Sequence, residues 1–237
     1  MIRTLLAVAF ALLPATAGSE PAVGGEVVVL VHGLLRSDRS MQPLARSLSD
    51  AGYRTVALDY PTTELPPDDL VAVLEREIEA CCEDAPRLHF VTHSLGGLMV
   101  RAILAKYRPA SLGRVVMLAP PNHGSEWVDR LGDWTLFRWL LGPTAVELGT
   151  GPTGFPQRLP RPDYEVGVIA GTTSYRLGAD EVLGGANDGT VSVASTRLDG
   201  MTDFATVPES HTFIMRSADV AELVRAFLRD GRFHPAP

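Results

Sequence analysis

The 237-residue chain is poor in cysteine, and it contains only Cys81 and Cys82. Adjacent cysteines rarely bond to each other because the ring that they would close is small, so we expect no disulfide. Cys82 continues a helical stripe of apolar residues and is expected in the core; the stripe begins with Leu70, Leu74 and Ile78. No cysteine or histidine spacing resembles a zinc site, and we expect neither a metal nor a cofactor.

An excess of positive charge is also missing. The 28 acidic side chains outnumber the 21 Lys and Arg, which gives a net charge of −7, and no basic run interrupts the pattern. A chain of this kind repels a phosphate backbone. We therefore expect no nucleic-acid partner.

The only strongly apolar terminal run covers residues 5–13, which is too short to span a bilayer. Arg3 precedes this run and Ala15-Thr16-Ala17 follows it, as in a secretory signal with its cleavage site. We expect removal of residues 1–17 and export of one domain, residues 18–237, to the periplasm or beyond, with no stable membrane span. An uncleaved membrane anchor is the alternative, and the oligomeric state stays open.

What the chain does contain is an alternation of β-type and helical patterns, without a Gly/Ser linker or a repeat. The alternation predicts an α/β fold with a mostly parallel sheet and helices on both faces. Ser40 and Ser217 are the expected caps of two helices, the first of which ends near Gly52. The expected strands begin or lie at residues 27–31, 55–60, 88, 114–118, 166–170 and 205–207.

Residues 92–97, T-H-S-L-G-G, follow the apolar run Leu88-His89-Phe90-Val91 and open a helical pattern. A serine between a strand and a helix, with glycine two places later, is the layout of a nucleophile elbow. The tight turn strains the serine backbone and exposes its hydroxyl. Thr92 stands where such motifs usually have glycine. The pattern predicts Ser94 as a nucleophile.

A second motif follows the continuous apolar run at residues 27–31, which is typical of a buried parallel strand. His32-Gly33-Leu34-Leu35 comes directly after it, and Gly33 allows a close turn. Taken alone, these residues are equally consistent with an ordinary turn. Their combination with a serine elbow downstream favours a functional loop.

Together these two motifs resemble bacterial lipases and esterases of the α/β-hydrolase fold. Residues 117–125, 187–191 and 210–211 are similar to further segments of that group, and the resemblance extends from 27 to 227, weakest at 127–162. It implies oxyanion-stabilising N–H groups at Leu34 and Leu95. In related lipases an acidic residue two places after the histidine binds calcium, but Phe213 stands there, so no calcium site is carried over.

The same resemblance implies the chain order Ser, acid, His. A serine hydroxyl needs a base to take its proton, and a carboxylate orients that base. Ser94, Asp188 and His211 fit this order, with Asp188 in an Asn-Asp-Gly turn. His123 is the rival base. The rival acids are Asp180, Glu181, Asp199 and Asp203.

Residues 127–162 break the alternation of strands and helices, and we refer to them as the cap segment. They contain all three tryptophans of the chain, Trp127, Trp134 and Trp139, followed by many prolines and glycines. An apolar insertion at this point predicts a short cap over an acyl pocket, with the tryptophans in contact with substrate. The alternative is an ordinary core helix that covers the edge of the sheet.

The sequence therefore predicts an exported serine carboxylic-ester hydrolase that acts on an ester or lipid through an acyl-enzyme. Transfer of the acyl group to an alcohol instead of water would make it an acyltransferase. A catalytically silent lipid-binding module on the same fold is the third hypothesis.

Overall fold

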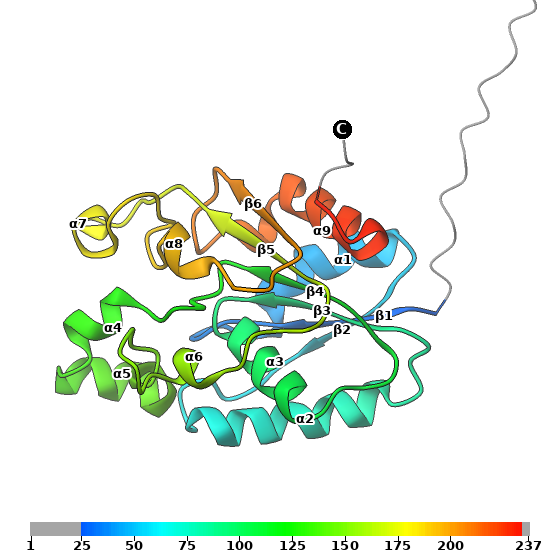
Figure 1. Ribbon diagram of the computed structural model, residues 1–237, viewed down its shortest axis with the longest axis horizontal. Coiled ribbons are helices and arrows are strands. Elements are labelled where there is room, and N and C mark those ends of the chain that lie inside the picture. Colours follow the sequence, from blue (N-terminus) through cyan, green and yellow to red (C-terminus); the bar gives the residue numbers. More distant parts are fainter. Residues whose placement is uncertain (1–24, 234–237) are drawn as a thin grey trace, which may run out of the picture.

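A six-stranded parallel sheet organises the computed structural model, which describes residues 25–233 (Figure 1). The strand order is β2-β1-β3-β4-β5-β6, so β2 lies on one side of β1 and the later strands follow in order on the other side. The α/β class with a parallel sheet is confirmed, whereas the predicted signal at residues 1–17 lies outside the described residues. The strands are β1 Val27–Val31, β2 Arg54–Leu58, β3 Leu88–His93, β4 Leu112–Leu118, β5 Val166–Gly171 and β6 Asp203–Val207.

Strand β3 lies inside the sheet between β1 and β4, and every residue of β1 and β3 is buried. Their β-branched and apolar sequences suit a strand that is covered on both faces. Side chains alternate between the faces, so that Val29 joins one core cluster and Val28 the other. Val31 pairs with Thr92 at the ends of the two strands, which brings the two sequence motifs side by side.

Helices cover both faces of the sheet, as predicted. Figure 1 shows α1 and α9 on one side and α2 and α3 on the other. Each pair covers its own apolar core cluster, one around Phe227 and one around Phe90. The bounds of these helices are α1 Gln42–Asp50, α2 Pro67–Cys82, α3 Leu95–Lys106 and α9 Ala218–Asp230.

The predicted cap of the first helix is wrong. A 3-10 helix, η1 Asp38–Met41, precedes α1 and contains Ser40, whose hydroxyl donates a hydrogen bond to the Ser37 carbonyl at 2.7 Å. The helix itself begins at Gln42 because Pro43, which has no N–H to donate, suits its first turn. Ser217 does occupy the N-cap position of α9, although its side chain makes no capping hydrogen bond.

The expectation that the cysteines stay unbonded is also wrong. Cys81 and Cys82 form a disulfide, with Cα atoms 3.8 Å apart. They are the last two residues of α2, so the small ring lies at a helix end, where the two side chains can turn toward each other. The Cys82 side chain is buried with Ile78 and Leu88, as the helical stripe predicted.

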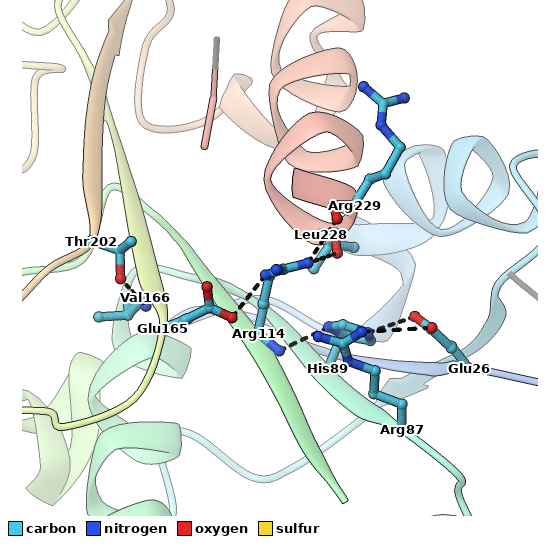
Figure 2. Close-up of polar contacts among 9 residues, drawn as sticks. All are labelled: Glu26, Arg87, His89, Arg114, Glu165, Val166, Thr202, Leu228 and Arg229. Atoms are coloured by element: carbon cyan, nitrogen blue, oxygen red, sulfur yellow. Dashed lines mark hydrogen bonds and ion pairs between the residues drawn. The ribbon is translucent and has the colours of Figure 1, made fainter. Parts of the chain in front are cut away.

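A polar network ties together the edge of the sheet at which the strands begin, the amino edge (Figure 2). The buried His89 ring donates from Nε2 to Glu26 at 2.9 Å and accepts at Nδ1 from the Arg114 N–H at 2.8 Å. Arg114 also contacts Glu165 and donates to the last carbonyls of α9. A cation is favourable at the C-terminal end of a helix. The network therefore links β1, β3, β4 and β5 with α9.

The opposite edge, the carboxyl edge, carries the remaining helices, of which Figure 1 shows α4, α5 and α7 beyond the ends of the strands. The segment between β4 and β5 bends at Gly142, whose φ is +78°. It contacts the loop between β2 and α2, where the Thr144 hydroxyl donates to the Leu65 carbonyl at 2.7 Å. No helix within residues 25–233 is long and apolar enough to cross a membrane. The helices here are α4 Glu126–Leu131, α5 Thr135–Val146, α6 Phe155–Arg158, α7 Ala179–Leu183, α8 Val193–Thr196 and the 3-10 helix η2 Ile214–Arg216.

Candidate active site

Ser94 joins the end of β3 to the start of α3 and has φ +51° and ψ −121°, which is a strained conformation for a residue other than glycine. The turn needs a glycine two residues later, because a Cβ at Gly96 would overlap the Val31 carbonyl. Thr92 is tolerated in place of glycine: its side chain is buried and its hydroxyl lies 3.4 Å from the Val116 carbonyl. The elbow geometry predicted for residues 92–97 is present.

Ser94 forms a hydrogen-bonded chain with two other predicted residues. His211 Nε2 lies 3.1 Å from Ser94 Oγ, and His211 Nδ1 lies 2.7 Å from Asp188 Oδ2. Asp188 is almost completely buried, and its second oxygen accepts the N–H groups of Thr190 and Val191. Nδ1 therefore keeps its proton and donates it in a hydrogen bond to the carboxylate, which leaves Nε2 as the acceptor for the serine hydroxyl.

The rival residues lie elsewhere. The His123 side chain is exposed, and within the described residues its ring makes no hydrogen bond. Asp180 accepts a hydrogen bond from the Asn187 side chain, and Asp203 accepts the Phe233 N–H. Thus the structure brings His211 and Asp188, rather than these alternatives, to Ser94.

The loop after β1 lies against the serine. A Cβ added at Gly33 would be 2.9 Å from the Ser94 Cβ, so only glycine fits this approach without a shift. Leu35 has φ +58°, and its N–H donates to Thr62 Oγ1 at 3.2 Å, which turns the loop. Leu95 is the first residue of α3, where N–H groups have no intrahelical acceptor and the helix dipole favours negative charge. The oxyanion roles of Leu34 and Leu95 stay predictions.

Within residues 25–233, none of the three tryptophans makes a hydrogen bond or a ring contact with Ser94, His211 or Asp188. Trp134 and Trp139 are 63% and 77% exposed. Trp127 is half-buried under the Arg176 guanidinium, whose carbon lies 3.8 Å from the ring centroid. Helices α4 and α5 of the cap segment lie beyond the ends of the strands (Figure 1), and the role of the segment in substrate contact stays a prediction.

Two polar residues of the site region were not assigned by sequence. Arg101 is buried on α3 and donates to Asn122 Oδ1 at 3.0 Å and to the Leu159 and Pro160 carbonyls at 3.3 Å. Burial lowers its pKa to about 10. Asn122 in turn donates to the Thr196 carbonyl at 2.8 Å. The signal available in the sequence was an arginine within an otherwise apolar helix face, since a buried charge needs specific partners.

Burial also determines the electrostatics beside Ser94. The pKa of His93 lies well below its usual range, because the ring is buried and because His211 is close by. Within residues 25–233, no group of three or more His, Cys, Asp or Glu side chains is arranged to hold a metal ion. The candidate site is thus a serine, a histidine and a carboxylate at the carboxyl edge of a parallel sheet, where such folds place their ligands.

A family model described as "Alpha/beta hydrolase family" matches residues 28–234, which is most of the chain. The chain belongs to the alpha/beta hydrolase family. Among curated proteins, a putative carbamate hydrolase, RutD of Variovorax paradoxus strain S110, is 35% identical over 116 residues. That match covers 44% of this chain and 43% of the relative, so less than half of the length of either protein is compared.

Members of known structure have the same fold. The mature lipase BlEst2 from Bacillus licheniformis has a TM-score of 0.69 and 21% identity, over 90% of this chain and 94% of that one. The phospholipase PlaB from Legionella pneumophila has a TM-score of 0.67 and 20% identity, over 88% and 58% of the two chains. A metagenomic carboxyl esterase, MGS0156, has a TM-score of 0.64 and 22% identity, over 87% of this chain and 71% of that one. At such identities the likeness concerns the fold.

Proposed function

We propose that this alpha/beta hydrolase is a serine carboxylic-ester hydrolase in which Ser94, His211 and Asp188 form a catalytic triad. The observation that carries the proposal is the chain of two hydrogen bonds, 3.1 Å and 2.7 Å long, that joins the three side chains. Structural neighbours named lipase, phospholipase and carboxyl esterase make esters the first substrate class to test.

In this mechanism Ser94 Oγ attacks the acyl carbon while His211 Nε2 takes the hydroxyl proton. The carbonyl π electrons move to oxygen, and the N–H groups of Leu34 and Leu95 stabilise the oxyanion. Collapse of this intermediate expels the alcohol, which leaves with the proton from His211, and an acyl-enzyme remains. Water then attacks the ester carbon and gives a proton to His211 Nε2; the bond from the acyl carbon to Ser94 Oγ breaks, His211 returns the proton to Oγ, and the acid departs.

Asp188 supports both halves of the reaction. Its buried carboxylate fixes the Nδ1–H tautomer of His211 and stabilises the imidazolium that forms in each transition state. Each oxyanion donor contributes about 3–4 kcal/mol of transition-state stabilisation in enzymes of this kind. The backbone N–H of Leu95 gains further from its place at the first turn of α3.

The direct test is labelling by a fluorophosphonate, followed by localisation of the modified peptide. We expect one adduct on Ser94, and hydrolysis of p-nitrophenyl butyrate that falls at least about 10³-fold in Ser94→Ala. Ser111→Ala, at the amino edge of the sheet, is the control and keeps full activity. Absence of an adduct would favour the silent binding module instead.

Acyl transfer shares every step up to the acyl-enzyme, so the acceptor decides between the two activities. Addition of short and long alcohols to the assay separates them: a hydrolase releases free acid at an unchanged rate, whereas an acyltransferase forms the new ester. A p-nitrophenyl carbamate belongs in the same assay, because one relative is named a putative carbamate hydrolase.

We also propose that the protein is exported. The pattern at residues 1–17 motivates this proposal, and the Cys81–Cys82 disulfide supports it, because such bonds persist in oxidising compartments. Fractionation of cells that express the full chain, with N-terminal sequencing of the product, is the test. Recovery of uncleaved protein in the cytoplasm would contradict it.

A further inference from the structure

The backbone of His211 is held at both of its polar groups. Its N–H donates to the Asp188 carbonyl at 3.0 Å. Its own carbonyl accepts a hydrogen bond from Nε2 of His93, also at 3.0 Å. The backbone of the histidine is therefore bonded on one side to the acid residue and on the other side to the residue that precedes Ser94. The segments that contain Ser94, Asp188 and His211 are thus joined by these two backbone contacts as well as by the side-chain hydrogen bonds.

Within residues 25–233, the hydrogen bond to the His211 carbonyl is the one hydrogen bond of the His93 ring. The ring is 1% exposed, and its centroid lies 4.8 Å from that of the His211 ring. A carbonyl oxygen only accepts, so Nε2 carries the proton and Nδ1 is left with a lone pair. Nδ1 is buried and has no hydrogen-bond partner within residues 25–233. A Cβ at Gly33 would be 2.9 Å from Nδ1, so the loop after β1, which is the predicted oxyanion loop with Leu34, packs directly against this ring.

We propose that His93 is a positioning residue, which holds the His211 backbone through its Nε2–H and thereby keeps the His211 side chain within reach of Ser94. This inference rests on the proposed function of the same site. His93 is the last residue of β3, and Ser94 is covalently attached to it. We call the hydrogen bond from His93 to the His211 carbonyl the clamp. The residue that makes the clamp and the nucleophile Ser94 are neighbours at the end of the fully buried strand β3.

A displacement of the His211 backbone away from Ser94 has to break the hydrogen bond from His93 Nε2 to the His211 carbonyl. A 1 Å misplacement of catalytic groups lowers rates by about 10²-fold, even where no reacting group is removed. A side chain that merely filled space at residue 93 would need no donor. The proposal therefore predicts that the donor at this place, more than the volume of the side chain, determines the rate of acylation.

Two variants separate donor from volume. His93→Met keeps a side chain of similar length without a donor, and His93→Gln restores an amide N–H near the place of Nε2. We expect the fluorophosphonate labelling rate and kcat to fall about 10- to 100-fold in His93→Met, with KM unchanged. In His93→Gln both rates recover most of this loss. The control is His89→Gln, a buried histidine of the same strand, which keeps the wild-type labelling rate per folded molecule.

Equal labelling rates in His93→Met and the wild-type protein would overturn the proposal, as would a His93→Gln variant that is folded and as slow as His93→Met. Should His93→Met not fold, nitrogen-15 NMR of histidine-labelled wild-type protein decides the question. We expect His93 to be the Nε2–H tautomer, and an Nδ1–H tautomer rules the clamp out. A wild-type protein that is never labelled on Ser94 contradicts the proposed function instead, whatever the tautomer of His93.

Discussion

Strand β3 has a buried histidine at each end, and the two differ in how their nitrogens are used. His89, at the amino edge, has both nitrogens engaged, by Glu26 and by the Arg114 N–H. His93, at the carboxyl edge, has one nitrogen bonded to the His211 carbonyl and one without a partner. Burial lowers the pKa of both rings. The same residue type on one strand is thus fully paired at one end and only half paired at the other.

The difference separates stability from chemistry along a single strand. The amino edge uses a carboxylate to complete a network that locks four strands and a helix together. The carboxyl edge also has a carboxylate–histidine pair, Asp188 and His211, but there the second ring nitrogen faces a serine hydroxyl. An unsatisfied buried polar atom is unfavourable. At His93 this unfavourable atom lies directly beside the candidate site.

The largest effect is expected when the two carboxylates are neutralised in turn. Asp188→Asn should lower kcat by about 10⁴-fold, because the amide stabilises the wrong tautomer of His211. Glu26→Gln should leave kcat unchanged and lower the free energy of unfolding by about 1–3 kcal/mol, because the charge-assisted hydrogen bond to His89 is replaced by a weaker, neutral one. Initial rates and urea unfolding measure both. A loss of activity in Glu26→Gln would show that the two edges are coupled.

A smaller effect is expected at the glycine that packs on each ring. A Cβ at Gly113 would lie 2.6 Å from the His89 ring, and one at Gly33 would lie 2.9 Å from His93 Nδ1. Gly113→Ala should lower the free energy of unfolding by about 1–3 kcal/mol at normal specific activity. Gly33→Ala should lower kcat more than stability, because it displaces the oxyanion loop. If both variants have the same ratio of activity loss to stability loss, the contrast between the edges is wrong.

The pH dependence of stability is the third expectation. Burial is the main cause of the lowered pKa of His89, which outweighs the raising effect of Glu26; Arg87 and Arg114 lower it further. The unfolded chain binds a proton near the ordinary value of 6.5, whereas the folded state resists it, so the contribution of His89 is complete above that pH and is lost as the pH falls below it. His32 and His93 act in the same direction.

Urea unfolding at about pH 7.5 and about pH 5 measures this loss. The wild-type protein should be less stable at the lower pH, and His89→Gln should lose less between the two conditions. The comparison uses the difference between the two pH values, so the lower overall stability of the variant does not enter. An identical pH dependence of the free energy of unfolding in the two proteins would show that His89 does not contribute to it.

The smallest effect concerns the exposed aromatic residues. If Trp134 and Trp139 receive an acyl chain, each added methylene gains up to about 0.8 kcal/mol until the pocket is filled. Each change to Ala should then flatten the preference for longer p-nitrophenyl esters and spare acetate hydrolysis. Tyr107→Ala, which removes an exposed ring at the far end of α3 from Ser94, is the control. A profile that peaks at acetate in all four proteins would refute a cap over an acyl pocket.

Much of this arrangement could be predicted from sequence because local patterns determine it. The apolar runs of β1 and β3 mark both as interior strands of the sheet, and residues that follow parallel strands meet at one edge. Ser94, Asp188 and His211 lie far apart in the chain, yet each follows a strand, which is why their meeting was predictable. The contact of His93 with the His211 carbonyl was not, since it depends on a backbone oxygen that no pattern marks.

The errors have a common physical source. The start of α1 depends on Pro43 and on a 3-10 turn, both of which override the capping preference of Ser40. The expectation for the cysteines relied on general statistics and ignored their place at the end of α2. Arg101 was overlooked because its partners are a side chain and two carbonyls from distant loops. In each case a neighbouring residue or a contact that the general rule does not consider decided the outcome.

The bond between Cys81 and Cys82 has a practical consequence. The sequence has two cysteines, and both sulfurs are in that bond, so the oxidised protein offers no thiol to an alkylating reagent. A single cysteine introduced on the carboxyl edge, for example at the exposed Leu177, would be the sole attachment point for a fluorophore or spin label. Movements of the loops around Ser94 then become observable without removal of either native cysteine, provided that no reductant is present.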